Sequence, residues 1–233
     1  YKDLAFSTKA VCCLTTDDLK KHLPKSCFPV IVKSVLYDLA TVTKKFYLYA
    51  DIDYPDHTLN KPTELDFPNV KFGNNVLVGK NCKIGQNSII GSNTIIEKNV
   101  SIGSGSVIGS HVIVKNTLIE NNVVIQDGCK IGLKGFGFVP IKGKNIRMPH
   151  IGKVVIENNA EIGANCTIDR GSIDDTIVGE NTFLDNQVHV AHNVKIGKNC
   201  MIAGQVGFAG SSIIGDNVLI GGQAGVSGHL RIG

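Results

Sequence analysis

Aliphatic side chains recur at every sixth position over most of this chain. One series runs from Phe72 to Val114 and a second runs from Val178 to Ile232. Gly commonly follows the aliphatic residue directly, and Asn commonly stands three positions after it. A six-residue period is typical of parallel β-helices, in which three repeats complete one coil and successive coils stack about 4.8 Å apart. The pattern therefore predicts a mainly β fold, a parallel β-helix built from hexapeptide repeats.

The residues between the aliphatic positions fit the corners of such a coil. A sharp corner often requires φ > 0, which Gly and Asn tolerate best. The residue four positions after the aliphatic one must be small, and Cys82, Cys129, Cys166 and Cys200 all fall there. We expect these cysteines to act as small buried apolar groups. Seven Cys with no C-x-x-C pair favour reduced thiols over a disulfide framework.

The repeat is interrupted once at length, between Leu133 and His150, and we expect an excursion loop at about 133–150. Residues 128–156 carry six Lys or Arg and no Asp or Glu. Such a charge run is either a solvated surface loop or a contact for an anionic substrate or an acidic partner. The sequence leaves both alternatives open.

The first 66 residues lack the period and predict a small α/β domain ahead of a β-helix that occupies 67–233. Two short apolar runs, Ala10–Leu14 and Phe28–Val32, predict strands. Apolar residues at helical spacing predict an amphipathic helix over Val35–Phe46.

Composition and charge limit the functional classes. Residues 51–68 hold three Pro and five acidic residues, which is typical of a linker. A hydrophobic content of 42% excludes disorder, while 26 Gly, 6% aromatics and no Trp indicate a core of small aliphatic side chains. A net charge of +4 does not indicate a nucleic-acid binder. No apolar run reaches the roughly 18 residues of a membrane span, so we expect a cytoplasmic protein with at most peripheral membrane association.

The repeat arithmetic selects a candidate site. Because positions 18 or 36 apart share a face, His192, the backbone of Gly210 and His229 are expected to form one column, with Asp185 across one corner. A histidine can accept a proton, a glycine N–H can stabilise an oxyanion, and a carboxylate can fix the imidazole tautomer. These residues together favour acyl transfer. The alternative is that they are polar residues at solenoid corners without a catalytic role.

Longer motifs extend this interpretation to a family. IGANCTIDRGSIDDTIVG (162–179) followed by LDNQVHVAHNVKIG (184–197) resembles the bacterial UDP-3-O-acylglucosamine N-acyltransferases, and GFGF (135–138) and SGHLRIG (227–233) match the same family. The resemblance covers essentially the whole chain. It implies a left-handed β-helix, a homotrimer with sites between neighbouring β-helices, and the third step of lipid A synthesis in Gram-negative bacteria. In that step a 3-hydroxyacyl chain moves from acyl carrier protein to the 2-amino group of UDP-3-O-acylglucosamine, with no metal and no cofactor beyond the carrier's phosphopantetheine.

The resemblance also implies roles for individual residues. His192, in the AHN motif, matches the catalytic base of the family, and Gly210 matches its oxyanion donor. Asp185, which would orient the imidazole, and Asn186 match positions that line the same site. His229 matches a second site histidine that contacts the substrate phosphate or the carrier phosphopantetheine.

The N-terminal domain of the family binds uridine between aromatic rings, and Tyr1 matches the last residue of its Phe-x-x-Asn-x-x-Tyr segment. The alternative function is that of the related UDP-N-acetylglucosamine O-acyltransferases, or of another sugar acyltransferase that uses acetyl-CoA. A different class is a non-catalytic solenoid scaffold or a zinc enzyme with three His ligands converging between chains.

Overall fold

The computed structural model describes residues 2–48, 50, 52 and 55–233. The chain forms two compact units, one of residues 1–52 with 137–149 and one of residues 53–136 with 150–233. The boundary between them therefore falls near residue 52, earlier than the expected residue 66. Tyr1 lies outside the described residues.

The smaller unit contains the predicted strands and helix. Strands β1 and β2 pair in parallel, and the longer helix α2 begins after Ser34, whose Oγ accepts the N–H of Tyr37. The antiparallel hairpin β14–β15 belongs to the same unit. The elements are α1 (Lys2–Phe6), β1 (Cys12–Thr15), the 3-10 turn η1 (Lys20–His22), β2 (Phe28–Ile31), α2 (Val35–Phe46), β14 (Phe138–Ile141) and β15 (Lys144–Arg147). No helix among the described residues is long and apolar enough to cross a bilayer.

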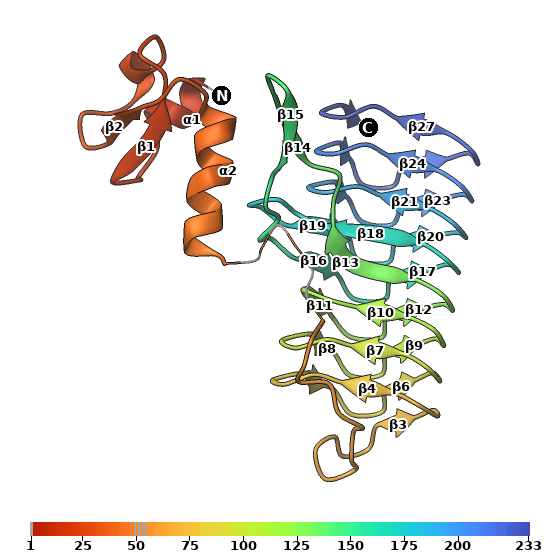
Figure 1. Cartoon of the computed structure of the whole chain (residues 1–233). Helices are drawn as coiled ribbons and strands as arrows, with labels where there is room; N and C mark the ends of the chain where they lie inside the picture. The colour runs from red at the N-terminus through yellow and green to blue at the C-terminus, as the bar shows by residue number, and fades with distance from the viewer. Residues whose placement is uncertain (1, 49, 51, 53–54) are drawn as a thin grey trace. The chain divides into compact units, whose positions relative to one another are not determined.

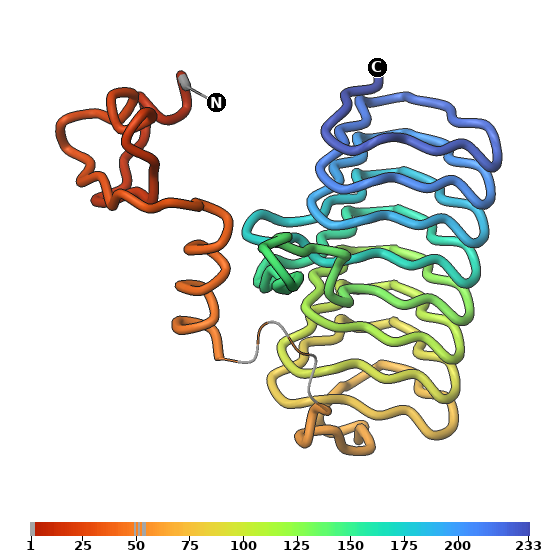
Figure 2. The backbone as a smooth tube through the Cα atoms, turned by 45° about the horizontal axis from the view of Figure 1, so that its top comes forward, coloured from red at the N-terminus to blue at the C-terminus, as the bar shows by residue number. Residues whose placement is uncertain are grey.

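The larger unit is the predicted left-handed parallel β-helix. Its strands form three parallel sheets of eight, and each coil contributes one strand to each sheet. Figures 1 and 2 show the coils stacked on one another along the solenoid. The first sheet contains β4 (Leu77–Val78), β7 (Ile95–Ile96), β10 (Ile113–Val114), β13 (Lys130–Lys134), β18 (Thr167–Arg170), β21 (His189–Val190), β24 (Gly207–Phe208) and β27 (Gly225–Val226). The second contains β5 (Lys83–Ile84), β8 (Ser101–Ile102), β11 (Thr117–Ile119), β16 (Val154–Ile156), β19 (Thr176–Val178), β22 (Lys195–Ile196), β25 (Ile213–Ile214) and β28 (Arg231–Ile232). The third contains β3 (Lys71–Phe72), β6 (Ile89–Ile90), β9 (Val107–Ile108), β12 (Val124–Ile125), β17 (Glu161–Ile162), β20 (Phe183–Leu184), β23 (Met201–Ile202) and β26 (Leu219–Ile220).

The repeated aliphatic residue points into the coil, as predicted. Ile96, Ile131 and Ile168 are fully buried and stack along the first sheet. The expectation that Gly and Asn share one role at the corners holds for Gly105 (φ 69°) and Gly128 (φ 78°) but not for the Gly that directly follows the aliphatic residue. Asn193 and its equivalents adopt φ near 60°, whereas Gly163 has an ordinary φ and is small because the backbone carbon of Asp185 would lie 2.6 Å from any Cβ.

The segment expected to be a linker packs in part against the first coils of the β-helix. The Asp56 carboxylate is buried and accepts hydrogen bonds from the backbone N–H groups of Lys98 (2.8 Å) and Thr58 (2.9 Å). The hydroxyl of Thr58 also donates to this carboxylate (2.7 Å). Burial opposes the shift, but these hydrogen bonds together hold the pKa of Asp56 below its ordinary value. Asn60 bridges to Val78 at the edge of the first sheet. The linker prediction is therefore wrong for this part, because prolines and carboxylates here cover the end of the solenoid.

All seven cysteines are free thiols, as predicted. Cys129, Cys166 and Cys200 are fully buried, and each thiol donates to a carbonyl oxygen of the adjoining coil. The neighbouring Cys129, together with burial, raises the pKa of the Cys166 thiol. These cysteines fill small core positions.

Candidate active site

His192 lies at the corner that follows β21, in a cleft of about 580 Å³. The outer face of the first sheet forms one wall through His189, Gly207 and Gly225, and Phe136 stands at the rim, 84% exposed. No described atom lies within 4 Å of the Cβ position of either glycine, so the sheet surface beside His192 is open.

Asn193 determines the tautomer of His192. Its Nδ2 donates to the carbonyl oxygen of Asp174 (2.9 Å), and its Oδ1 accepts the backbone N–H of Ser172 (3.0 Å), so the orientation of the amide is unambiguous. The same Oδ1 lies 3.0 Å from Nδ1 of His192. Because an amide oxygen can only accept, Nδ1 carries the proton and Nε2 of the neutral ring holds the lone pair. Nε2 is therefore the atom that can take a proton in this cleft.

Gly210 lies directly against this imidazole. A Cβ at residue 210 would lie 2.8 Å from Cε1 and 2.9 Å from Nε2 of His192, so only glycine fits. At the equivalent corner positions Ala164 and Lys198, the N–H donates to a side-chain oxygen of the next coil. No described residue accepts the N–H of Gly210. The structure thus pairs a proton acceptor with a backbone donor that has no acceptor among the described residues.

His229 is close to this pair but does not continue its column. In the next coil it is Gly228 that lies next to Gly210. The backbone N–H of His229 donates to the carbonyl oxygen of Gly210 (3.2 Å). His229 is exposed and has φ 60°, the same corner position as Asn193. The third position of the predicted column is therefore occupied by Gly228, and His229 lies one residue further along the chain.

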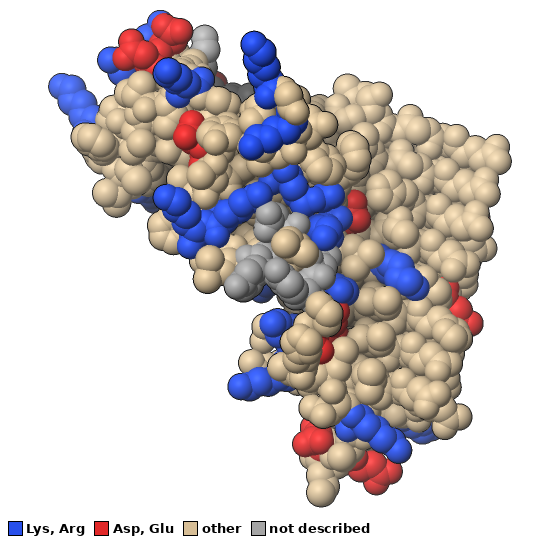
Figure 3. Space-filling model, viewed as in Figure 1, with Lys and Arg blue, Asp and Glu red and all other residues tan. Residues whose placement is uncertain are grey.

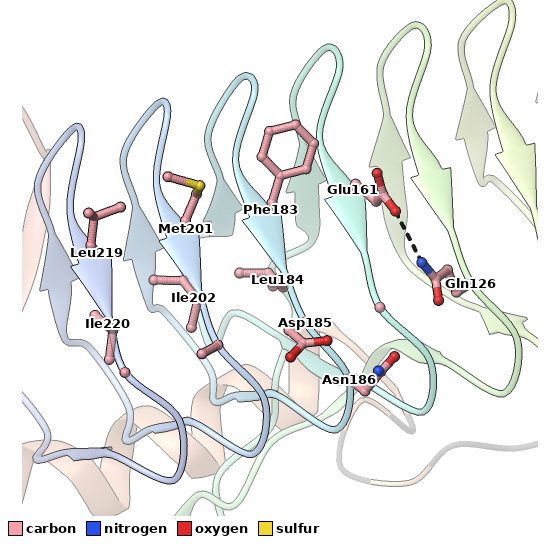
Figure 4. A pocket seen from close by; sticks show the side chains of 13 residues that line it. Gln126, Glu161, Phe183, Leu184, Asp185, Asn186, Met201, Ile202, Leu219 and Ile220 are labelled. Atoms are coloured by element: carbon pink, nitrogen blue, oxygen red, sulfur yellow. Dashed lines mark hydrogen bonds between the residues drawn. The ribbon is translucent and has the colours of Figure 1, made fainter.

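Asp185 and Asn186 occupy a different corner, between the third and first sheets. They line a separate pocket of about 600 Å³ beside the outward side chains of Phe183 and Met201 (Figure 4). Asn186 accepts the N–H of Ala164 through Oδ1 (2.8 Å). Within this chain Asp185 does not reach the imidazole of His192, because β21 separates the two corners, and Asn193 makes the contact with Nδ1 instead.

Two ionisable residues, His189 and Asp169, lie on the same sheet face as the cleft. His189 contacts Oγ1 of Thr167 through Nδ1 (2.7 Å), and its Nε2 lies 4.0 Å from the Asp169 carboxylate. Burial raises the pKa of Asp169 to about 7 and lowers that of His189. The described residues contain no group of three or more His, Cys, Asp or Glu arranged to hold a metal ion.

Sequence reasoning missed the contribution of Asn193 and His150. Asn193 stands at the corner position that Asn fills throughout the repeat, so nothing in the period distinguishes it. His150 ends the interruption, where no periodicity applies, and its ring lies 4.9 Å from that of His192. Only the fold brings it there.

Comparison with known proteins supports this interpretation of the repeats. The family model for bacterial transferase hexapeptides, a unit of six repeats, matches residues 67–98, 81–116 and 175–210. The model for the hexapeptide repeat of succinyl-transferases matches residues 212–230. These matched stretches therefore carry the repeat that is named for bacterial transferases. The stacked hexads are the scaffold that carries the candidate site.

Curated relatives match a shorter segment of this chain at higher sequence identity. A segment of 70 residues is 53% identical to a UDP-3-O-acylglucosamine N-acyltransferase of Rhizobium rhizogenes, and 69 residues are 55% identical to the protein of that name from Dechloromonas aromatica. Each match covers 30% of this chain and 20% of the relative. The similarity therefore spans about a fifth of the length of these relatives.

Solved structures match over a longer stretch. LpxA from Acinetobacter baumannii superposes with a TM-score of 0.61 and 28% identity, over 69% of this chain and 61% of that one. UDP-N-acetylglucosamine O-acyltransferase from Moraxella catarrhalis gives 0.50 and 29%, over 71% and 61%. Proteins named as N-acyltransferases and proteins named as O-acyltransferases are thus both similar to parts of this chain.

Proposed function

We propose that this protein transfers an acyl chain from acyl carrier protein to the 2-amino group of a UDP-3-O-acylglucosamine. The observation that carries the proposal is the pairing of His192 with Gly210: an imidazole with its lone pair on Nε2 lies against a glycine whose backbone N–H no described residue accepts. The 53–55% identity to proteins named as N-acyltransferases supports the amino acceptor.

The reaction follows from these two groups. Nε2 of His192 takes a proton from the sugar amine as its nitrogen attacks the thioester carbonyl carbon. The N–H of Gly210 donates to the oxyanion that forms on the carbonyl oxygen. When the C–S bond breaks, the imidazolium returns the proton to the leaving thiolate, and the products are an amide and the carrier thiol. His229 and Asn186 are proposed to contact the substrates.

A homotrimer is part of the proposal. The outer face of the third sheet exposes Phe183 (40%), Met201 (55%) and Leu219 (68%) on three successive coils. At the same coils the first sheet presents open glycines, Gly207 and Gly225. The solenoid surface in this region is largely uncharged (Figure 3). Packing of one face against the other between copies would bury this apolar surface and would let Asp185 of a neighbouring copy approach a site that it does not reach within its own chain.

An acyl-transfer assay with purified protein tests the function. The wild type should form the amide from 3-hydroxyacyl carrier protein and UDP-3-O-acylglucosamine, and His192→Ala should lower kcat by roughly 10² to 10⁴. His57→Ala, at an exposed site away from the cleft, is the control. Transfer from acetyl-CoA to a sugar hydroxyl, without transfer from the acyl carrier, would instead support the O-acyltransferase alternative that the structural neighbours favour.

A further inference from the structure

The excursion returns to the β-helix beside the candidate base. His150 lies where the chain returns, four residues before β16, and is 2% exposed. Its ring centroid lies 4.9 Å from that of His192, with the planes inclined by 58°. On its other side His192 meets Gly210. The imidazole of His192 is therefore held between a buried histidine and a glycine corner.

His150 is itself fixed by the outgoing arm of the same excursion. Its Nδ1 accepts the backbone N–H of Gly135 at 2.8 Å, which places the proton of a neutral ring on Nε2. A Cβ on Gly135 would lie 2.8 Å from Cε1 of His150 and 2.8 Å from Cβ of His192. The outgoing and returning arms thus meet at His192, and the absence of a side chain at residue 135 allows the contact.

A buried arginine joins the two arms at their base. Arg170, 4% exposed on β18, donates from Nε to the carbonyl oxygen of His150 (2.9 Å) and from Nη1 to that of Gly132 (3.3 Å). Gly132 lies on β13, where the excursion leaves the coil. One rigid guanidinium therefore sets the distance between the departing and the returning chain.

We propose that His150 is a positioning residue for His192, held in place by Gly135 and Arg170. Its ring restricts the imidazole of His192 to the orientation in which Nδ1 faces Asn193 and Nε2 lies against Gly210. The excursion is then more than a surface insertion, because residues of its two arms hold the His192 ring in position. The proposal rests on the proposed function in that His192 must be the base for the restriction to affect catalysis.

The test compares His150→Leu, which keeps bulk and loses the acceptor, with His150→Gln, whose amide oxygen can still accept the N–H of Gly135. His150→Leu should lower kcat about ten- to a hundredfold with little change in KM, because a small misplacement of a catalytic group has that effect. His150→Gln should retain most of kcat. Gly135→Ala disturbs the same contact from the other arm and should resemble His150→Leu. His57→Leu is the control at an exposed histidine.

The ring nitrogens of His192, observed by ¹⁵N NMR, give a readout that does not depend on activity. Their chemical shifts should move in His150→Leu and Gly135→Ala and remain near wild type in His150→Gln. Folded variants with unchanged kcat and unchanged His192 shifts would overturn the proposal. If His192→Ala stays active while the shifts move as expected, the proposed function fails and the positioning contact stands. If His150→Leu does not fold, Gly135→Ala and His150→Gln decide by the same two measurements.

Discussion

Nδ1 of His192 lies 3.0 Å from Oδ1 of Asn193, the next residue in the chain. The side-chain amide is anchored by two further hydrogen bonds, from the backbone N–H of Ser172 and to the carbonyl oxygen of Asp174, and the backbone N–H of Asn193 donates to Oγ1 of Thr176. A neutral amide that is held rigidly can thus determine which imidazole nitrogen carries the proton. A carboxylate is the more familiar partner in this position. The amide also leaves the ring without a fixed negative neighbour on that side.

Replacing this amide should impair catalysis more than stability. Asn193→Ala removes the acceptor for Nδ1, so kcat should fall, by less than the roughly 10²- to 10⁴-fold expected for loss of the base itself. Asn199→Ala is a matched control, since residues 193 and 199 have φ of 62° and 55° and both variants place alanine in a left-handed conformation that costs about 1–2 kcal/mol. Equal kcat values in the two variants would contradict the role of Asn193. Steady-state kinetics with thermal melting separates the two effects.

Gly210→Ala should abolish most of the activity while the β-helix remains folded. The new methyl group would lie 2.8 Å from Cε1 of His192, so the ring must leave its position beside the N–H. Gly207→Ala adds a methyl group in the same cleft that does not touch the His192 ring of its own chain, so that ring should keep its position and the chain should fold. Amide formation and melting curves check both expectations. A fully active Gly210→Ala protein would exclude the proposed oxyanion geometry.

Stability should depend on the ionisation of Asp169. Burial raises its pKa from 3.8 to about 7 in the folded chain, so the folded state holds a proton that the unfolded state releases between these values. By linkage, the free energy of unfolding should fall as pH rises from about 4 to about 7 and then level off. Arg170 opposes the shift, and His189, 4.0 Å away, has a lowered pKa and is largely neutral at the upper end of this range.

The check on this expectation is urea unfolding at several pH values. Asp169→Asn should remove the pH-dependent loss and should be more stable than wild type above pH 7. Glu64→Gln, at an exposed loop position, should follow the wild-type curve. A wild-type curve with no slope between pH 4 and 7 that Asp169→Asn leaves unchanged would show that the carboxyl group ionises normally.

Thiol labelling should report the fold directly. Cys12 is exposed and should react quickly with a thiol reagent, whereas Cys129, Cys166 and Cys200 are fully buried and should react only on unfolding. All seven thiols should be titrated in denaturant without reductant, since none forms a disulfide. Mass spectrometry of the labelled peptides shows which cysteines have reacted. Rapid labelling of Cys166 in the native protein would contradict its burial.

The local pattern of residues determined the architecture. A coil closes on itself every three hexads, so the six-residue period alone specifies which side chains point inward and which lie one coil apart, and this brought His192 and Gly210 together correctly. The small cysteines followed from the same period, because a narrow triangular core admits few large groups. The strands and the helix of the smaller unit followed from local apolar spacing.

Only the tertiary structure decided how the candidate site is completed. The period could not place the excursion, since an interruption has no register, and so it could not foresee that Gly135 and His150 meet at His192. It also could not distinguish Asn193 from other corner asparagines, or show that the strand between two corners keeps Asp185 away from His192. Periodicity specifies position along a coil, whereas the orientation of a side chain depends on neighbours that are distant in sequence, and those neighbours make the site.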